Sequence, residues 1–262
     1  MTGLDGAVVI VTGAGSGIGR AAVSAFSAAG ARVLATGRSS ARLEETAALA
    51  AVPESVTPVL CDVTKPEDVA AAVDHALTRF GRLDCAFNYA GTFGRLGPLH
   101  EDDEENFHTV VDTNLRGLWL CLKHQIPAMI AQGGGSVVNC SSVAGHHGHP
   151  QTAMYSATEH AIIGLSKSAA LQYAPAGVRV NVISPGRTDP DVLPDLRQRP
   201  ATAEDMAYAA VGLASPLAGN VTGQALIIYG GVGPRPHAAD QTSMLMSTGR
   251  PAPAGAHDYV LQ

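Results

Sequence analysis

Short apolar runs alternate with longer segments of helical periodicity along most of the chain. The first run, AVVIVT at residues 7–12, leads through a glycine-rich loop into a helical stretch that ends at Gly30. A continuous apolar, β-branched run of this kind is typical of a strand whose two faces are both covered. The pattern therefore predicts a strand packed between helices from the beginning of the sequence.

The same alternation predicts the other elements. We expect further strands at residues 32–36, 56–61, 84–87, 136–142 and 179–184, helices at residues 41–51, 66–80, 101–132 and 155–174, and one more helix and strand before residue 231. Repeated β-α units of this length predict an α/β fold, a doubly wound (Rossmann-type) parallel sheet of about seven strands. We assign residues 1–231 to this single domain. Residues 232–262, rich in Pro, Gly and Ala, are expected to form a tail that is disordered, docks on a neighbouring subunit or covers the substrate cleft.

Composition and charge exclude several classes of partner. The chain has 46% apolar and 15% charged residues, a net charge of −6 and a pI near 5.9. Because this balance leaves no basic face for a phosphate backbone, we expect no nucleic-acid partner. We find neither an apolar stretch long enough to span a bilayer nor a signal peptide, and we expect a cytoplasmic protein without a membrane partner.

Cysteine and histidine spacings predict no metal site. Four cysteines stand singly in apolar segments and are expected to be buried and reduced: Cys61, Cys85, Cys121 and Cys140. The carboxylates at residues 101–105 suit the positive end of a helix better than a metal. Three histidines lie in one loop, His146, His147 and His149, without the further ligands that a metal needs. One of them could serve as a substitute acid or base.

The loop TGAGSGIG at residues 12–19 carries the first sign of function. Its glycines allow a tight turn and close approach of a ligand to the backbone, and the helix that follows offers free N–H groups to an anion. A glycine-rich loop alone is a weak signal. Between a strand and a helix near the N-terminus, it predicts a pyrophosphate site.

The end of the second strand bears on coenzyme preference. A dinucleotide site that prefers NAD usually has an acidic residue here, whereas this chain has Gly37 followed by Arg38. A guanidinium suits a 2′-phosphate, so we expect NADP(H), with NAD possible. The alternative is that Arg38 is a solvated cation that stacks on adenine. Asp62 follows the third strand, at the edge where ligands bind in such sheets.

The segment YSATE at residues 155–159 opens a long predicted helix, in which Tyr155 and Glu159 lie one turn apart on the same face. A phenol is useful as an acid or base near neutral pH when its anion is stabilised, as a nearby cation would do. Here the neighbour is a carboxylate, which raises the pKa of the phenol. We therefore expect Tyr155 to be a poor base at neutral pH.

Together these motifs give the chain a likeness to a known family. TGAGSGIG at residues 12–19, Asp62, NYAG at residues 88–91, Asn114, Ser142 thirteen residues before Tyr155, and Pro185-Gly186 occur in this order. The sequence from about residue 7 to residue 231 therefore resembles the short-chain dehydrogenase/reductase family. The resemblance implies a homodimer or homotetramer formed largely through the long helices.

The resemblance also implies a role for each matching residue. Ser142 would hydrogen-bond the substrate oxygen, Tyr155 would transfer the proton, and Asn114 would hold a water in a proton relay. Glu159 completes the expected catalytic group. The residues expected to bind the cofactor are Gly13, Ser16, Gly17, Ile18, Gly19, Arg38, Asp62, Val63, Asn88, Ala90, Gly91, Tyr155, Pro185, Gly186 and Thr188.

The departures from the family pattern are as informative. The family has a lysine where this chain has Glu159, and that lysine binds the nicotinamide ribose and lowers the pKa of the tyrosine. Tyr89 replaces the second Asn of the usual NNAG motif, and Pro190 stands where a carboxamide-binding threonine is common. The segment at residues 187–205 is short and Pro-rich compared with the usual helical lid over the substrate.

We therefore expect an oxidoreductase that transfers a hydride between NADP(H) and a small carbonyl or alcohol substrate. Two alternatives remain open because of Glu159. One is a non-redox enzyme on the same scaffold, such as an isomerase, cyclase or dehydratase. The other is a catalytically silent, cofactor-binding subunit.

Overall fold

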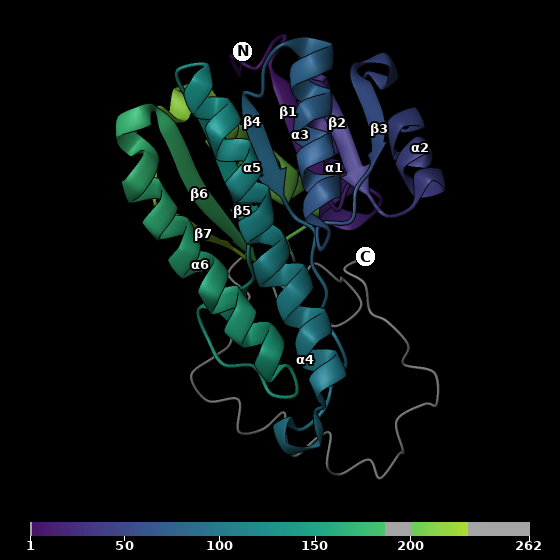
Figure 1. Cartoon of the computed structure of the whole chain (residues 1–262), viewed down its shortest axis with the longest axis vertical. Helices are drawn as coiled ribbons and strands as arrows, with labels where there is room; N and C mark the ends of the chain where they lie inside the picture. Colours follow the sequence, from purple (N-terminus) through teal and green to yellow (C-terminus); the bar gives the residue numbers. More distant parts are fainter. Residues whose placement is uncertain (1, 187–200, 230–262) are drawn as a thin grey trace.

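Seven parallel strands form one sheet in the order β3-β2-β1-β4-β5-β6-β7 in the computed structural model, which describes residues 2–186 and 201–229 (Figure 1). Each strand predicted from the hydrophobic pattern is present, so the doubly wound α/β fold is confirmed. The strands are β1 (Val8–Thr12), β2 (Arg32–Gly37), β3 (Val56–Leu60), β4 (Cys85–Asn88), β5 (Gly135–Cys140), β6 (Val178–Pro185) and β7 (Ala225–Ile228).

Helices cover both faces of this sheet. One layer holds α1 (Gly17–Ala28), α2 (Ser40–Ala48) and α7 (Ala203–Ala214). The other, in front in Figure 1, holds α3 (Pro66–Phe80), α5 (Gly117–Ala131) and α6 (Ala153–Tyr173), with α4 (Glu104–Val110) projecting beyond the sheet. Short 3₁₀ turns complete the described elements: η1 (Pro53–Ser55), η2 (Leu99–Glu101), η4 (Val143–Gly145), η5 (Ala174–Ala176) and η7 (Pro216–Ala218).

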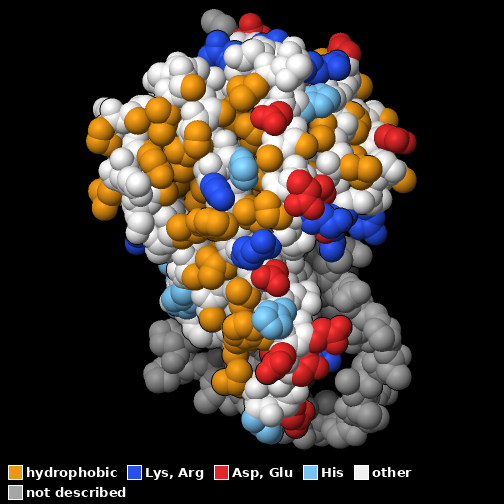
Figure 2. Space-filling view, in the orientation of Figure 1, with side chains coloured by type: hydrophobic (Ala, Val, Ile, Leu, Met, Phe, Trp, Pro, Cys, Tyr) orange, Lys and Arg blue, Asp and Glu red, His pale blue; other side chains and the backbone are white. Residues whose placement is uncertain are grey.

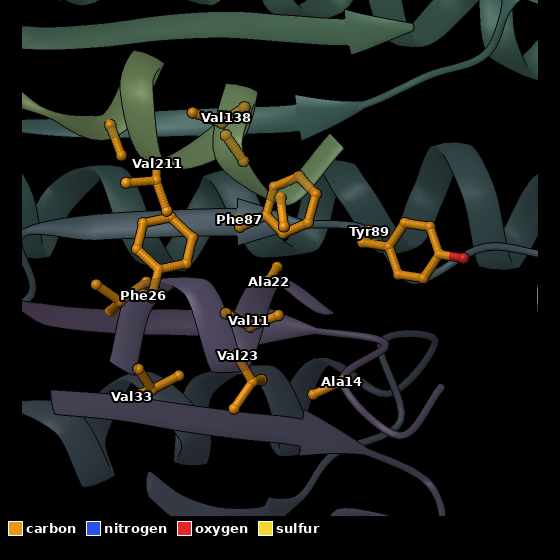
Figure 3. Close-up of a cluster of buried hydrophobic side chains, with 14 of the residues drawn as sticks. Val11, Ala14, Ala22, Val23, Phe26, Val33, Phe87, Tyr89, Val138 and Val211 are labelled. Atoms are coloured by element: carbon orange, nitrogen blue, oxygen red, sulfur yellow. The ribbon is translucent and has the colours of Figure 1, made fainter. Parts of the chain in front are cut away.

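The alternating side chains of β1 explain why its sequence is apolar without a break. Val9 and Val11 pack with Phe26 and Phe87 in the core on the α1 side of the sheet (Figure 3). Val8 and Ile10 point the other way, into the core beneath α3 and α5. Both faces of the strand are therefore desolvated, and every position along it contributes to hydrophobic burial.

The predicted helix at residues 101–132 differs most from the structure. It is divided into α4, a π-helical segment η3 (Val111–Arg116) and α5. The wider π turn carries Asn114, and a single extra residue in a helix does not disturb the apolar periodicity enough to be recognised. Thr188, Pro190, the short lid segment, the predicted boundary at residue 231 and the tail at residues 232–262 lie outside the described residues.

Candidate active site and cofactor cleft

The chain changes direction across the sheet between β1 and β4, which are neighbours although two strands separate them in sequence. The glycine-rich loop follows β1, and Asn88-Tyr89-Ala90-Gly91 begins at the end of β4. Open α/β sheets bind ligands in the crevice outside the carboxyl ends of the strands at such a point. The fold thus brings two of the predicted motifs to one crevice.

The glycine-rich loop has a backbone shape that other residues fit poorly. Gly13 has φ of +69°, and a Cβ built on Gly19 overlaps the carbonyl oxygen of Gly13. Arg20 fixes the loop from α1, because its Nη2 donates to the Gly15 carbonyl at 2.9 Å and pairs with Glu45 Oε2 at 2.6 Å. The contacts of Arg20 therefore fix the loop from the side of α1 and α2.

A cleft of about 180 Å³ lies along this loop. Seven predicted cofactor residues line it: Gly13, Ser16, Arg38, Asp62, Val63, Ala90 and Gly91. The prediction missed eight further lining residues: Gly15, Gly37, Ser39, Arg42, Leu43, Cys61, Tyr89 and Thr113. Of these, Gly15 stands inside the glycine motif, and Arg42 carries a charge that suits a phosphate, so both carried a usable signal.

The other predicted cofactor residues within the described ranges do not line this cleft. Gly17, Ile18 and Gly19 form the first turn of α1. Pro185 ends β6 and Gly186 follows it, and the Gly186 N–H donates to the Ile228 carbonyl at 2.9 Å. Pro185 and Gly186 lie at the carboxyl edge of the sheet, where we expect the nicotinamide end of a dinucleotide to extend.

Asn88 is committed to a buried amide network beneath the crevice. Its Nδ2 donates to Gln125 Oε1 at 2.9 Å and to Asn139 Oδ1 at 3.0 Å, and Gln125 Nε2 donates to Asn88 Oδ1 at 2.9 Å. Asn139 Nδ2 in turn donates to Ser166 Oγ at 2.9 Å. Since the amide groups of Asn88 are occupied in this way, we assign it a structural role.

Tyr89 supports the glycine-rich loop from below. Its side chain is 6% exposed, and its ring lies against the positions where Gly13 and Gly19 would carry a Cβ (Figure 3). Burial raises the pKa of its phenol, so the group is uncharged at neutral pH. The departure from the NNAG pattern therefore fills the core at the foot of the cleft.

Ser142 and Tyr155 come together from two different elements. Ser142 follows β5 as the N-cap of η4, and its Oγ accepts a hydrogen bond from the Ala144 N–H at 3.1 Å. Tyr155 lies in the first turn of α6, near enough to Ser142 for the serine side chain to act on the pKa of its phenol. Burial, and then Glu159, raise the pKa of Tyr155 well above its ordinary value, while Ser142 lowers it. The phenol therefore keeps its proton at neutral pH.

Glu159 is as buried as Tyr155, at 4% exposure for each residue. Its Oε2 finds no hydrogen-bond partner among the described residues, and none of the ion pairs formed there includes it. Burial raises the pKa of this carboxyl to about 8, and the Ser141 side chain opposes the shift. Glu159 is thus mainly neutral at pH 7, whereas the sequence argument treated it as a charged carboxylate. Its effect on the phenol is correspondingly smaller than that of burial.

Asn114 holds the chain that follows β4. Its Oδ1 accepts from the Thr92 N–H at 2.8 Å, and its Nδ2 donates to the Thr92 carbonyl at 2.9 Å and to Thr158 Oγ1 at 3.3 Å. A cavity of about 10 Å³ lies beside it, lined also by Asn88 and Thr12. This is about the space of one water molecule.

The loop histidines face several environments. His146 Nε2 lies 2.9 Å from Ser184 Oγ, and burial lowers the pKa of His146, so the ring is neutral at pH 7. His149 Nδ1 lies 3.2 Å from Thr152 Oγ1.

Within residues 2–186 and 201–229, no three His, Cys, Asp or Glu side chains are grouped to hold a metal ion. The helices of these ranges also include none with the length and hydropathy needed to cross a membrane.

Comparisons with known proteins agree with the arrangement of this site. The chain is 39% identical over 242 residues to the A-factor type gamma-butyrolactone 1′-reductase (1S-forming) of Streptomyces virginiae, an alignment that covers 86% of this chain and 94% of the relative. It is also 39% identical over 248 residues to a 2,5-dichloro-2,5-cyclohexadiene-1,4-diol dehydrogenase of Sphingobium indicum, with 88% and 98% covered.

A comparison with solved structures also finds a similar reductase. A crystal structure of 3-ketoacyl-(acyl-carrier-protein) reductase from Brucella melitensis, complexed with NADH, matches with a TM-score of 0.81 and 31% identity, covering 87% of this chain and 98% of the other. A family model described as short chain dehydrogenase matches residues 7–201. The chain therefore belongs to the short-chain dehydrogenase family.

Proposed function

We propose that the protein is an oxidoreductase that transfers a hydride between a nicotinamide dinucleotide and a carbonyl/alcohol pair. The observation that carries this proposal is the proximity of Ser142 and Tyr155 at the carboxyl edge of the sheet, the edge that also carries the glycine-rich loop. A carbonyl oxygen placed between these two hydroxyls is polarised by both. A bound nicotinamide dinucleotide supplies the hydride.

The cleft residues suit the adenosine end of that cofactor. Gly13 and Gly15 border the space for a pyrophosphate, and Asp62 also lines the cleft. Arg38 and Arg42 are both exposed at its α2 end, where a 2′-phosphate would be neutralised. This pair of cations supports NADP(H) as the preferred cofactor, with NAD(H) as the weaker one.

The protonation states favour the reductive direction. Tyr155 keeps its proton at neutral pH, so it can act as the acid that protonates the carbonyl oxygen as hydride reaches the carbon. Ser142 then stabilises the phenolate left behind. In alcohol oxidation the same phenol would have to begin as a base, which its raised pKa opposes. We infer that burial of Tyr155, without a cation at the position of Glu159, favours carbonyl reduction over alcohol oxidation.

Substrate, assembly and location follow from other features. The two relatives compared above are named for ring compounds, and we infer a small carbonyl compound that carries a ring. Apolar side chains gather on the face of α4, α5 and α6 (Figure 2), and we infer a homo-oligomer that covers them: Phe107, Trp119, Ile130 and Leu171. The free thiols of the described residues support a cytoplasmic location.

The test is a titration of the purified protein with NADPH and NADH, followed by an assay of coenzyme oxidation with cyclohexanone. We expect NADPH oxidation that depends on the ketone and falls about a hundredfold or more in Tyr155→Phe, with NADPH affinity retained. Coenzyme binding without oxidation of NADPH or reduction of NADP⁺ would identify a catalytically silent subunit. The neutral Glu159, which stands in place of a cation, supports that alternative. Product formation without coenzyme turnover would identify a non-redox enzyme.

A further inference from the structure

Phe93 covers the ring of Tyr155. The two ring centroids lie 4.4 Å apart with an interplanar angle of 42°. Phe93 and Met154 pack against a small apolar cluster formed by Tyr155, Val110 and Ala144, separate from the main cores of the sheet. Ser142 acts on the phenol of Tyr155, and Phe93 contacts the ring of the same tyrosine.

Two buried asparagines fix the backbone on either side of Phe93. Asn114 pairs with both the N–H and the carbonyl of Thr92, at 2.8 and 2.9 Å. Asn106 Oδ1 accepts from the Arg95 N–H at 2.7 Å. The exposed fractions of these asparagines are 2% and 5%. These three hydrogen bonds are therefore sheltered from water, which strengthens them.

Gly94 lets the chain pass this close to α4. Its φ is +68°, and a Cβ at this position would overlap Asn106 Oδ1 and Val110 Cγ2. Asn106 is itself held by Asp102, whose Oδ1 accepts from Asn106 Nδ2 at 2.8 Å. The Phe93 ring is thus presented by a short segment that is tied at both ends.

We propose that Phe93 is a specificity-determining residue that forms an apolar platform for ketones whose carbonyl belongs to an apolar ring. The inference rests on the proposed function, because it places the substrate oxygen between Ser142 and Tyr155. A carbonyl compound held there brings its carbon skeleton beside the Phe93 ring. An apolar ring then loses water on contact with an aromatic face, whereas the three-carbon skeleton of acetone or a polar skeleton gains little from it.

The experiment compares cyclohexanone with acetone in Phe93→Ala, Phe93→Leu and the wild-type protein. We expect Phe93→Ala to lower kcat/KM for cyclohexanone by about tenfold or more, mainly through KM, with a change for acetone below about threefold. Phe93→Leu should lie between, because it keeps most of the volume and loses the flat ring. Tyr208→Ala is the matched control, since Tyr208 is 66% exposed on α7, and it should leave the kcat/KM of both substrates unchanged.

Equal losses for both ketones, or no loss for cyclohexanone, would overturn the role of Phe93 and leave the oxidoreductase function standing. NADPH affinity and circular dichroism of each variant show whether the fold and the cofactor cleft are kept. A wild-type protein that reduces neither ketone would refute the proposed function instead. Calorimetric titration with cyclohexanone then decides the inference by itself: binding lost in Phe93→Ala supports it, and unchanged binding or none in the wild type overturns it.

Discussion

Replacing Glu159 with glutamine tests whether this buried carboxyl is neutral at pH 7 in the folded protein. Glutamine has nearly the same shape and stays neutral at every pH. Burial raises the pKa of Glu159 from 4.5 to about 8, so the folded protein keeps a proton that the unfolded chain releases. The folded state therefore binds more protons in this window, and its stability must fall as the pH rises from about 4.5 through about 8.

The magnitude follows from the width of the window. A difference of about 3.5 pH units, at about 1.4 kcal/mol for each unit, corresponds to about 5 kcal/mol in the free energy of unfolding. Glu159→Gln removes this dependence. At pH 9 we expect the free energy of unfolding of the variant to exceed that of the wild type by several kcal/mol, on the order of the figure above. At pH 5 the two free energies should differ by less than about 1 kcal/mol.

The measurement is urea unfolding at pH 5, 7 and 9, followed by circular dichroism. Glu44→Gln is the matched control, because Glu44 is exposed on α2 and its replacement should not alter the pH dependence. Tyr155 and Cys140 also face Glu159 and have raised pKa values, but they are present in both proteins. Equal slopes for the wild type and Glu159→Gln would show that Glu159 is charged in the folded protein, and would refute its neutral state at pH 7.

Three further predictions concern turnover and coenzyme binding. Glu159→Lys should raise alcohol oxidation by about tenfold or more, because a cation favours the phenolate; unchanged oxidation with NADP⁺ binding intact would contradict this. Arg38→Ala with Arg42→Ala should weaken NADPH binding by about tenfold or more and leave NADH binding unchanged, whereas equal losses in calorimetry would place the 2′-phosphate elsewhere. Gly19→Ala should weaken binding of both coenzymes, because the added Cβ overlaps the Gly13 carbonyl, while Gly212→Ala, on an open face of α7, should have no such effect. Normal binding by Gly19→Ala would show that the loop does not hold the pyrophosphate.

The sequence predicted best what depends on local pattern. The unbroken run of β1 and the glycines after it could be assigned because a strand buried on both faces and a positive φ each demand particular residue types. The one-turn spacing of Tyr155 and Glu159 followed from helical geometry alone.

What the sequence could not predict depends on three-dimensional surroundings. Glu159 is neutral because the folded protein removes its carboxyl from water. The spacing of residues along the sequence does not indicate this burial. The position of Tyr89 under the glycine-rich loop requires the β1–β4 pairing, in which Thr12 lies opposite Asn88. The π segment around Asn114 leaves the apolar pattern of the helix nearly unchanged.

The buried amide network constrains how this protein can change over evolutionary time. Asn88 and Asn139 are directly opposed in the pairing of β4 with β5, and Gln125 connects them to α5. Replacing one of the three by an apolar residue leaves a buried amide unpaired, at a cost of about 1–3 kcal/mol. Joint replacement removes the donors and acceptors together and avoids most of that cost. Descendant sequences should therefore exchange these amides in matched sets, and single exchanges should be selected against even though none of the three lines the cofactor cleft.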